Sequence, residues 1–178
     1  TVGYNVDSFG HNGGLPQILS KSGLKYYVFM RPDKNEKKIP SSLFIWKGTD
    51  GSAVPAYRLS VAYCLKTVED IQKIKELAEE ENVNEMAFYG VGNHGGGPTI
   101  KLLEETDELM AKDNEFLYGT VNEYFAEAEK SGEIAKAQEV SGDLQFHAKG
   151  CYSLNTMIKT LNRFSENALI KAEVFSSL

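Results

Sequence analysis

The run Tyr26-Tyr27-Val28-Phe29-Met30 places five large apolar side chains in succession. A strand with one solvated face would alternate apolar and polar residues, so this run predicts a strand covered on both faces. Strands of that kind belong to parallel sheets with helices on either side. We therefore expect an α/β fold built on a mostly parallel β/α sheet.

Short β-rich runs and helical stretches alternate on both sides of this strand, as the α/β class requires. The turn-forming cluster Gly48-Thr49-Asp50-Gly51-Ser52 joins two of the runs, which predicts an antiparallel β-hairpin inserted in the sheet. Thr67, with Asp70 three residues later, is typical of a helix N-cap. The predicted strands are 1–6, 25–30, 44–47, 54–59, 85–89 and 115–118, and the predicted helices are 15–22, 68–81, 99–112 and 121–130.

The last part of the chain has one long helical period. A helix of about 25 residues is about twice the globular mean, and its apolar stripe has no partner in what precedes it. We interpret residues 1–151 as a partial α/β domain and 152–178 as one long C-terminal helix, the first of a truncated helical bundle able to self-associate. Because Thr1 already lies in a predicted strand, we expect an excised piece of a longer chain. The stripe comprises Leu154, Met157, Leu161, Phe164, Ala168, Ala172 and Phe175.

Composition excludes several classes of protein. The 178 residues are 42% hydrophobic and 25% charged with a net charge of -6, and no basic block is present, so we expect no nucleic-acid partner. No apolar run approaches the roughly 18 residues of a membrane span, so we expect no membrane partner. Cys64 and Cys151 lack C-x-x-C spacing, which favours a reducing, cytoplasmic location.

Three glycine-containing loops each carry one of the three histidines, which suggests a shared pocket. Asp7-Ser8-Phe9-Gly10-His11 follows the first strand, where open α/β sheets bind ligands, although Asp7 could equally cap the next helix. The loop 90–99 is rich in glycine but lacks both the Walker lysine and the G-x-G-x-x-G spacing, which leaves a nucleotide site weakly supported. His147, alone in its loop, could be only structural.

Four motifs taken in order resemble the glycoside hydrolase family 38 α-mannosidases. They are Asp7-x-Phe9-Gly10-His11, the hairpin Phe44-x-Trp46-x-Gly48-x-Asp50-Gly51-Ser52, the loop Gly90–Thr99, and His147-x-Lys149-Gly150-x-Tyr152-Ser153 leading to Asn162-Arg163-x-x-Glu166. The resemblance covers nearly the whole chain. It implies the later part of an α/β catalytic domain followed by the first helix of a three-helix bundle.

The resemblance also implies an activity, a cofactor and site residues. Members hydrolyse α-linked mannose from oligosaccharides or glycans with retention and use one Zn²⁺ ion. Asp7 matches the nucleophile, which is also a zinc ligand, and His147 matches a second ligand. Phe9 and Arg31 match residues beside the bound sugar and the nucleophile. A carboxylate nucleophile and a zinc ion with N and O ligands suit this chemistry.

The chain departs from the family pattern in two ways. The other two zinc ligands, in a His-x-Asp motif, are absent, so the chain offers two of four and is expected to be inactive alone. Many relatives carry an aspartate, a candidate general acid, where this chain has Asn93 followed by His94. His94 is therefore a candidate acid and Asn93 a substrate-binding residue. The alternatives are a nucleotide-binding α/β domain and a non-catalytic carbohydrate-binding module.

Overall fold

The computed structural model describes residues 1–92, 95–145, 147–148, 150–151 and 155–178. The chain divides into two compact units, Thr1–His147 and Ala148–Leu178. The sequence-based boundary after residue 151 falls four residues later. That the second unit begins a helical bundle stays a prediction.

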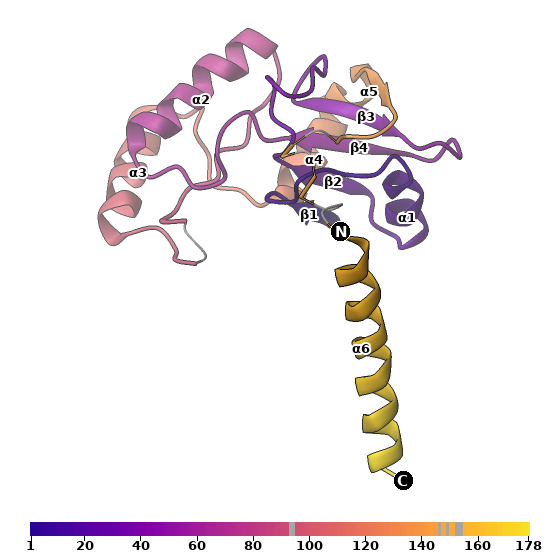
Figure 1. Ribbon diagram of the computed structural model, residues 1–178. Helices are drawn as coiled ribbons and strands as arrows, with labels where there is room; N and C mark the ends of the chain where they lie inside the picture. The colour runs from indigo at the N-terminus through magenta and orange to yellow at the C-terminus, as the bar shows by residue number, and fades with distance from the viewer. Residues whose placement is uncertain (93–94, 146, 149, 152–154) are drawn as a thin grey trace. The chain divides into compact units, whose positions relative to one another are not determined.

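The first unit is built on a five-stranded sheet with the spatial order β1-β2-β4-β3-β5 (Figure 1). Neighbours β1, β2 and β4 are parallel, β3 pairs with β4 antiparallel, and β5 is parallel to β3. The predicted mostly parallel sheet with an inserted hairpin is confirmed. The strands are β1 (Val2–Asn5), β2 (Tyr26–Phe29), β3 (Leu43–Lys47), β4 (Ala53–Arg58) and β5 (Glu139–Ser141).

Strand β2 is buried on both faces, as its apolar run predicts. Tyr27 and Phe29 enter one core with Leu19 of helix α1 (Leu15–Lys21), whereas Tyr26 and Val28 enter another with Phe125 of helix α4 (Val121–Lys130). Helices α1 and α4 therefore cover opposite faces of the sheet (Figure 1).

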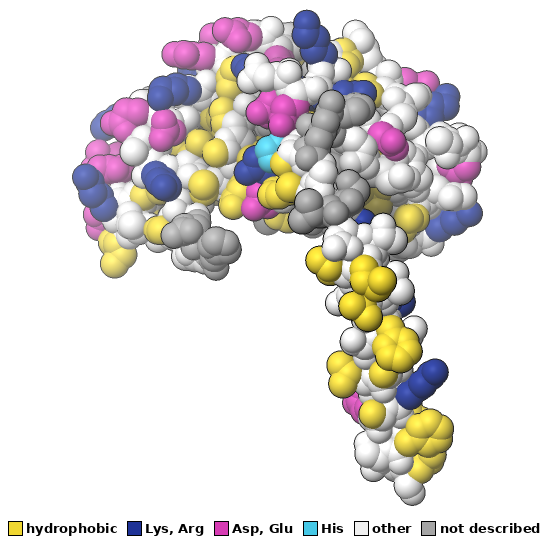
Figure 2. All heavy atoms as spheres, viewed as in Figure 1, with side chains coloured by type: hydrophobic (Ala, Val, Ile, Leu, Met, Phe, Trp, Pro, Cys, Tyr) yellow, Lys and Arg dark blue, Asp and Glu magenta, His cyan; other side chains and the backbone are white. Residues whose placement is uncertain are grey.

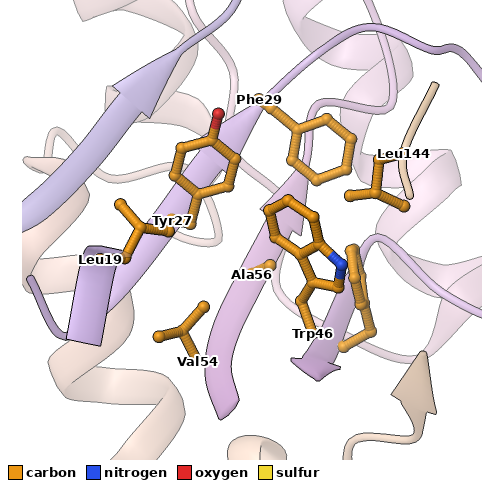
Figure 3. Packing of buried hydrophobic residues seen from close by; sticks show 8 residues of the cluster. Leu19, Tyr27, Phe29, Trp46, Val54, Ala56 and Leu144 are labelled. Carbon is orange, nitrogen blue, oxygen red and sulfur yellow. The ribbon is translucent and has the colours of Figure 1, made fainter. Parts of the chain in front are cut away.

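The α1 face is also covered by a segment that follows β5. Leu144 in this segment is fully buried and lies close to Phe29 and Trp46 (Figure 3). The indole N–H of Trp46 donates to the carbonyl of Gly142 at 2.9 Å, which fixes the segment against the sheet. A residue late in the sequence is thereby brought to the core formed by the first strands.

Helices α2 (Val68–Glu81) and α3 (Ile100–Lys112) lie side by side and share a third core around Ile71, Ile74 and Leu102 (Figure 1). Their N-caps are Thr67, as predicted, and Thr99, each of which accepts a backbone N–H through its hydroxyl. These helices end within one residue of their predicted bounds.

Two predicted strands are wrong. Residues 85–89 form only a single bridge, between Tyr89 and Leu65. The N–H of Met86 donates to the Tyr57 hydroxyl rather than to the backbone carbonyl of a neighbouring strand. Residues 115–118 contain no strand, since Leu117 is exposed and Glu115 pairs with Lys75. Both segments are β-rich, but neither pairs with a strand of the sheet.

Two short elements were not predicted from the sequence. Strand β5 has three residues, of which only Val140 packs on a core, and helix α5 (Glu133–Lys136) has four. Such short elements carry too few apolar residues to show a period.

The second unit contains helix α6 (Thr156–Ser176), whose 21 residues include no buried side chain. Its apolar residues are exposed along the whole helix (Figure 2). Among the residues that the structure describes, no helix is both long and apolar enough to cross a membrane.

Candidate active site

Asp7 and Arg31 lie at the carboxyl ends of two neighbouring parallel strands. Asn5 of β1 is in register with Phe29 of β2. Asp7 lies two positions after Asn5 and Arg31 two positions after Phe29, so the two side chains meet at the same edge of the sheet. The Arg31 Nε–H donates to Asp7 Oδ1 at 2.8 Å, and the Asp7 side chain is about half exposed. A charged pair thus stands where α/β sheets bind their ligands.

His11 joins the segments that carry the site. Its backbone N–H donates to the Leu144 carbonyl at 2.7 Å and its carbonyl accepts from the Leu144 N–H at 2.9 Å. Its ring Nε2 donates to the Arg31 carbonyl at 2.9 Å, while Nδ1 accepts from the Tyr27 hydroxyl at 2.8 Å. Burial lowers the pKa of His11, which agrees with this neutral form.

Glycine lets the segment after β5 approach the first loop closely. Gly10 has a φ of +141°, and a Cβ at this position would lie 2.5 Å from the Gln145 side chain. The N–H of Gly13 donates to the carboxylate of Asp143 from the same segment. The segment is therefore held along the Asp7 loop, and His147 follows it directly.

His147 completes a cluster with Asp7, Phe9 and Arg31. Its Nε2 lies 3.1 Å from Arg31 Nη1, and its ring meets the Phe9 ring edge-on at 4.9 Å between centroids. The Arg31 guanidinium also lies over the Phe9 ring at 5.7 Å, which is cation–π distance. Residues far apart in the sequence thus surround one guanidinium.

Glu36 is the fifth member of the cluster, and sequence reasoning did not find it. Its Oε1 accepts from His147 Nδ1 at 2.6 Å, and the side chains of His147 and Glu36 are 20% and 26% exposed. If the His147 ring is neutral, the two negative charges of Asp7 and Glu36 exceed the single positive charge of Arg31. The cluster then carries a net negative charge, which attracts a further cation.

The donor chemistry of the cluster fits a zinc ion in part. Asp7 and His147 provide an oxygen and a nitrogen of the types that Zn²⁺ prefers, and both already contact one cationic group, Arg31. Within the described residues, however, no three His, Cys, Asp or Glu side chains are grouped so as to hold a metal. That Asp7 and His147 are the two zinc ligands of this chain stays a prediction.

A hollow of about 270 Å³ lies at the glycine-rich loop, lined by Tyr63, Cys64, Tyr89 and four glycines of that loop. Gly92 has a φ of +73°, and a Cβ there would lie 2.9 Å from the Cys64 Cβ, so this position requires glycine. Asn93 and His94, the predicted substrate-binding residue and candidate acid, lie outside the described residues. Their roles stay predictions.

The structure brings together four sequence-predicted site residues: Asp7, Phe9, Arg31 and His147. Their chemical roles stay predictions, because no ligand contact tests them. The sequence marks His11 as part of the Asp7 motif but gives no sign that it holds the site in place. Sequence reasoning missed Glu36, because nothing in the local pattern separates it from its charged neighbours.

The family model and similar curated proteins indicate the same family. Residues 1–150 match the model of the glycosyl hydrolases family 38 N-terminal domain. The chain is 30% identical over 180 residues to alpha-mannosidase G of Dictyostelium discoideum and 28% identical over 179 residues to alpha-mannosidase 2C1 of Homo sapiens. These alignments cover 96% and 97% of the chain but only 16% and 17% of the two relatives. The chain therefore spans about one sixth of the length of the curated relatives it matches.

A solved structure shares the fold. The crystal structure of an alpha-mannosidase from Enterococcus faecalis V583 superposes with a TM-score of 0.63 at 19% sequence identity. The match covers 80% of this chain and 18% of that one. At this identity the likeness concerns the fold alone.

Proposed function

Because this chain belongs to glycosyl hydrolase family 38, we propose that it is the nucleophile-bearing part of an α-mannosidase. The intact protein, by which we mean a protein of family length that contains this chain, would hydrolyse α-linked mannose from oligosaccharides or glycans with retention. It would use one Zn²⁺ ion. The substrate class is taken from relatives that are named alpha-mannosidases.

The convergence of Asp7 and His147 on the Arg31 guanidinium supports this proposal most strongly. A carboxylate, an imidazole and a guanidinium meet beside an aromatic ring at the ligand-binding edge of an α/β sheet. A nucleotide site would instead use glycine N–H groups and a helix N-terminus, and a simple sugar platform would not require a charged cluster.

Each residue has a distinct proposed task. Asp7 attacks the anomeric carbon as the glycosidic C–O bond breaks, and the departing oxygen takes a proton from a general acid, for which His94 is the candidate. Water then hydrolyses the resulting glycosyl ester and frees the Asp7 carboxylate, so that two inversions give retention. The Arg31 Nε–H holds Oδ1 of that carboxylate in place. Phe9 offers an apolar surface beside the nucleophile for a sugar ring. His11 holds the Arg31 backbone and the Leu144 segment in register with the Asp7 loop.

Zinc would be held by Asp7 and His147 from this chain, together with the two ligands of the family's His-x-Asp motif. When bound, the ion would supply a Lewis-acidic centre that binds sugar hydroxyls and helps to hold the ring in a distorted shape. Two ligands are fewer than the three protein ligands of a usual catalytic zinc site, so we propose that the chain alone is inactive.

Substitutions of Asp7 and His147 in the intact protein test this division of tasks. Asp7→Asn removes the nucleophile, and we expect a loss of at least about 10³-fold in turnover of p-nitrophenyl α-mannoside that added zinc does not restore. His147→Ala removes one neutral ligand, so excess zinc should partly restore its activity.

Glu139→Gln serves as the control, since Glu139 is exposed and pairs with Lys47 away from the cluster. This variant should keep full turnover. Equal losses in Asp7→Asn and His147→Ala, with no response to zinc in either, would contradict the proposed roles.

A further inference from the structure

The proton on the His147 ring can be placed from its two neighbours. Arg31 Nη1 carries only donor hydrogens, so the ring Nε2 that it meets at 3.1 Å must present a lone pair. The ring proton therefore lies on Nδ1, where it is donated to Glu36 Oε1 at 2.6 Å. His147 is held as the Nδ1–H form of the neutral imidazole.

Glu36 is itself fixed by a turn that directly follows β2. Its second oxygen, Oε2, accepts the N–H of Asp33 at 3.0 Å, while the Asp33 carboxylate accepts the N–H groups of Asn35 and Glu36. The two side chains thus close the turn from both ends. The carboxylate has one oxygen committed to the turn and one to His147, which leaves it little freedom to rotate.

His11 shows that the local surroundings choose between the two forms of a neutral histidine in this fold. Its Nε2 faces a carbonyl, that of Arg31, and must donate, whereas its Nδ1 accepts from the Tyr27 hydroxyl. His11 is therefore the Nε2–H form, the opposite of His147. The difference follows from which ring nitrogen meets an acceptor.

We propose that Glu36 is the positioning residue for His147: it takes the Nδ1 proton and so presents the Nε2 lone pair to the Asp7–Arg31 pair. Arg31 and Glu36 belong to one loop and hold the two ring nitrogens from opposite sides. Metal-binding histidines commonly donate their other ring N–H to a carboxylate, which fixes the ring and raises its basicity. For zinc binding, the inference rests on the function proposed above.

The first experiment reads the position of the proton directly. Long-range ¹H–¹⁵N spectra of the ¹⁵N-labelled chain at about pH 8, above the ordinary imidazole pKa, distinguish a protonated from a bare ring nitrogen. We expect Nδ1–H for His147 and Nε2–H for His11. A spectrum in which His147 is mainly Nε2–H would overturn the proposal without any variant.

The variant Glu36→Gln tests whether the carboxylate causes this state. A glutamine side chain has one acceptor oxygen in place of two, so it can no longer accept the Asp33 N–H and the His147 Nδ1–H on separate oxygens, and its amide N–H₂ group would face one of these donors. We expect the Nδ1–H population of His147 to fall, while His11 stays unchanged as the internal reference. The control Glu139→Gln should change neither histidine. An unchanged His147 signal in Glu36→Gln would overturn the proposal.

The second experiment measures zinc affinity of the intact protein by competition with a chelating dye. We expect Glu36→Gln to raise the zinc Kd about 10- to 100-fold and Glu139→Gln to leave it unchanged. Equal affinity in wild type and Glu36→Gln would overturn the positioning role. If the wild type binds no zinc, the proposed cofactor is wrong, and the spectra of the chain still decide the role of Glu36.

Discussion

Glu85 is a mostly buried carboxylate that joins three segments of the first unit. It accepts hydroxyl hydrogen bonds from Ser42, at the start of β3, from Tyr57 in β4 and from Ser60. Tyr57 in turn accepts the N–H of Met86. This network fixes the extended segment after α2 without placing it in the sheet.

Burial raises the pKa of Glu85, although the three hydroxyl groups act in the opposite direction. The folded state therefore holds its proton more tightly than the unfolded state, where the pKa is about 4.3. The contribution of Glu85 to the free energy of unfolding is then fully present below that value. It is lost as the pH rises through the folded pKa.

Glu85→Gln should remove this pH dependence. As the pH rises from about 4 to about 8, the free energy of unfolding of the variant should increase relative to that of wild type, because only wild type loses the contribution of Glu85. Urea unfolding measures both values. Glu108→Gln, at an exposed site in α3, is the control. If the difference in free energy of unfolding between wild type and variant stayed constant across this pH range, the raised pKa of Glu85 would be contradicted.

At the scale of elements, α4 is the helix that closes one face of the sheet. Its Phe125 is fully buried and stacks on Tyr26 with 4.4 Å between ring centroids. A capping box starts the helix: Thr120 Oγ1 accepts the Glu123 N–H, and the Glu123 carboxylate accepts the Thr120 N–H. The capping box and the packing of Phe125 therefore both stabilise helix α4.

Removing the cap should weaken the whole first unit. Thr120→Ala should lower the free energy of unfolding by about 1 kcal/mol, whereas Phe125→Ala should lower it by about 3–5 kcal/mol because a cavity remains. Chemical denaturation measures both values. Thr160→Ala, inside the exposed helix α6, should change stability little. A Thr120→Ala variant as stable as wild type would show that the first turn of α4 is held by packing alone.

The elements that sequence predicts well are those whose own residues carry the signal. The unbroken run 26–30 predicts β2 because the four residues of that strand, Tyr26–Phe29, are all buried and so cover both of its faces. Residues 85–89 also form an apolar run, in which Met86 and Phe88 pack on one core while Ala87 and Tyr89 pack on another, but the segment makes only a single bridge, to Leu65. Pairing depends on neighbours, which a local pattern does not contain.

The site follows the same distinction. Asp7 and Arg31 follow recognisable strands, so their meeting at one sheet edge could be anticipated from strand order. Glu36 reaches His147 across 111 positions through a turn that the sequence does not mark. His11 is placed by its hydrogen bonds to Arg31 and Leu144, which exist only in the folded chain.

At the scale of the whole molecule, the exposed apolar residues of α6 require cover. Leu161, Phe164 and Phe175 are 56%, 71% and 73% exposed, although large apolar side chains in series rarely stay in contact with water. We propose that the chain self-associates through this helix at tens of micromolar, as sedimentation velocity would detect. Leu161→Lys combined with Phe164→Glu should yield a monomer, and Lys171→Glu should not. A monomeric wild type at these concentrations would refute the proposal.

Because β5 and His147 come late in the chain, synthesis on the ribosome builds the site in two stages. Asp7 and Arg31 emerge early on neighbouring strands, whereas His147 follows Arg31 by 116 positions. At about 5–20 residues per second this delay lasts about 6–23 s. During that interval the nascent chain contains the residues of the acid–guanidinium pair but not the imidazole, and for most of it β3 but not β5. The growing polypeptide thus gains the second of its two proposed zinc ligands only after all five strands of the sheet have been translated.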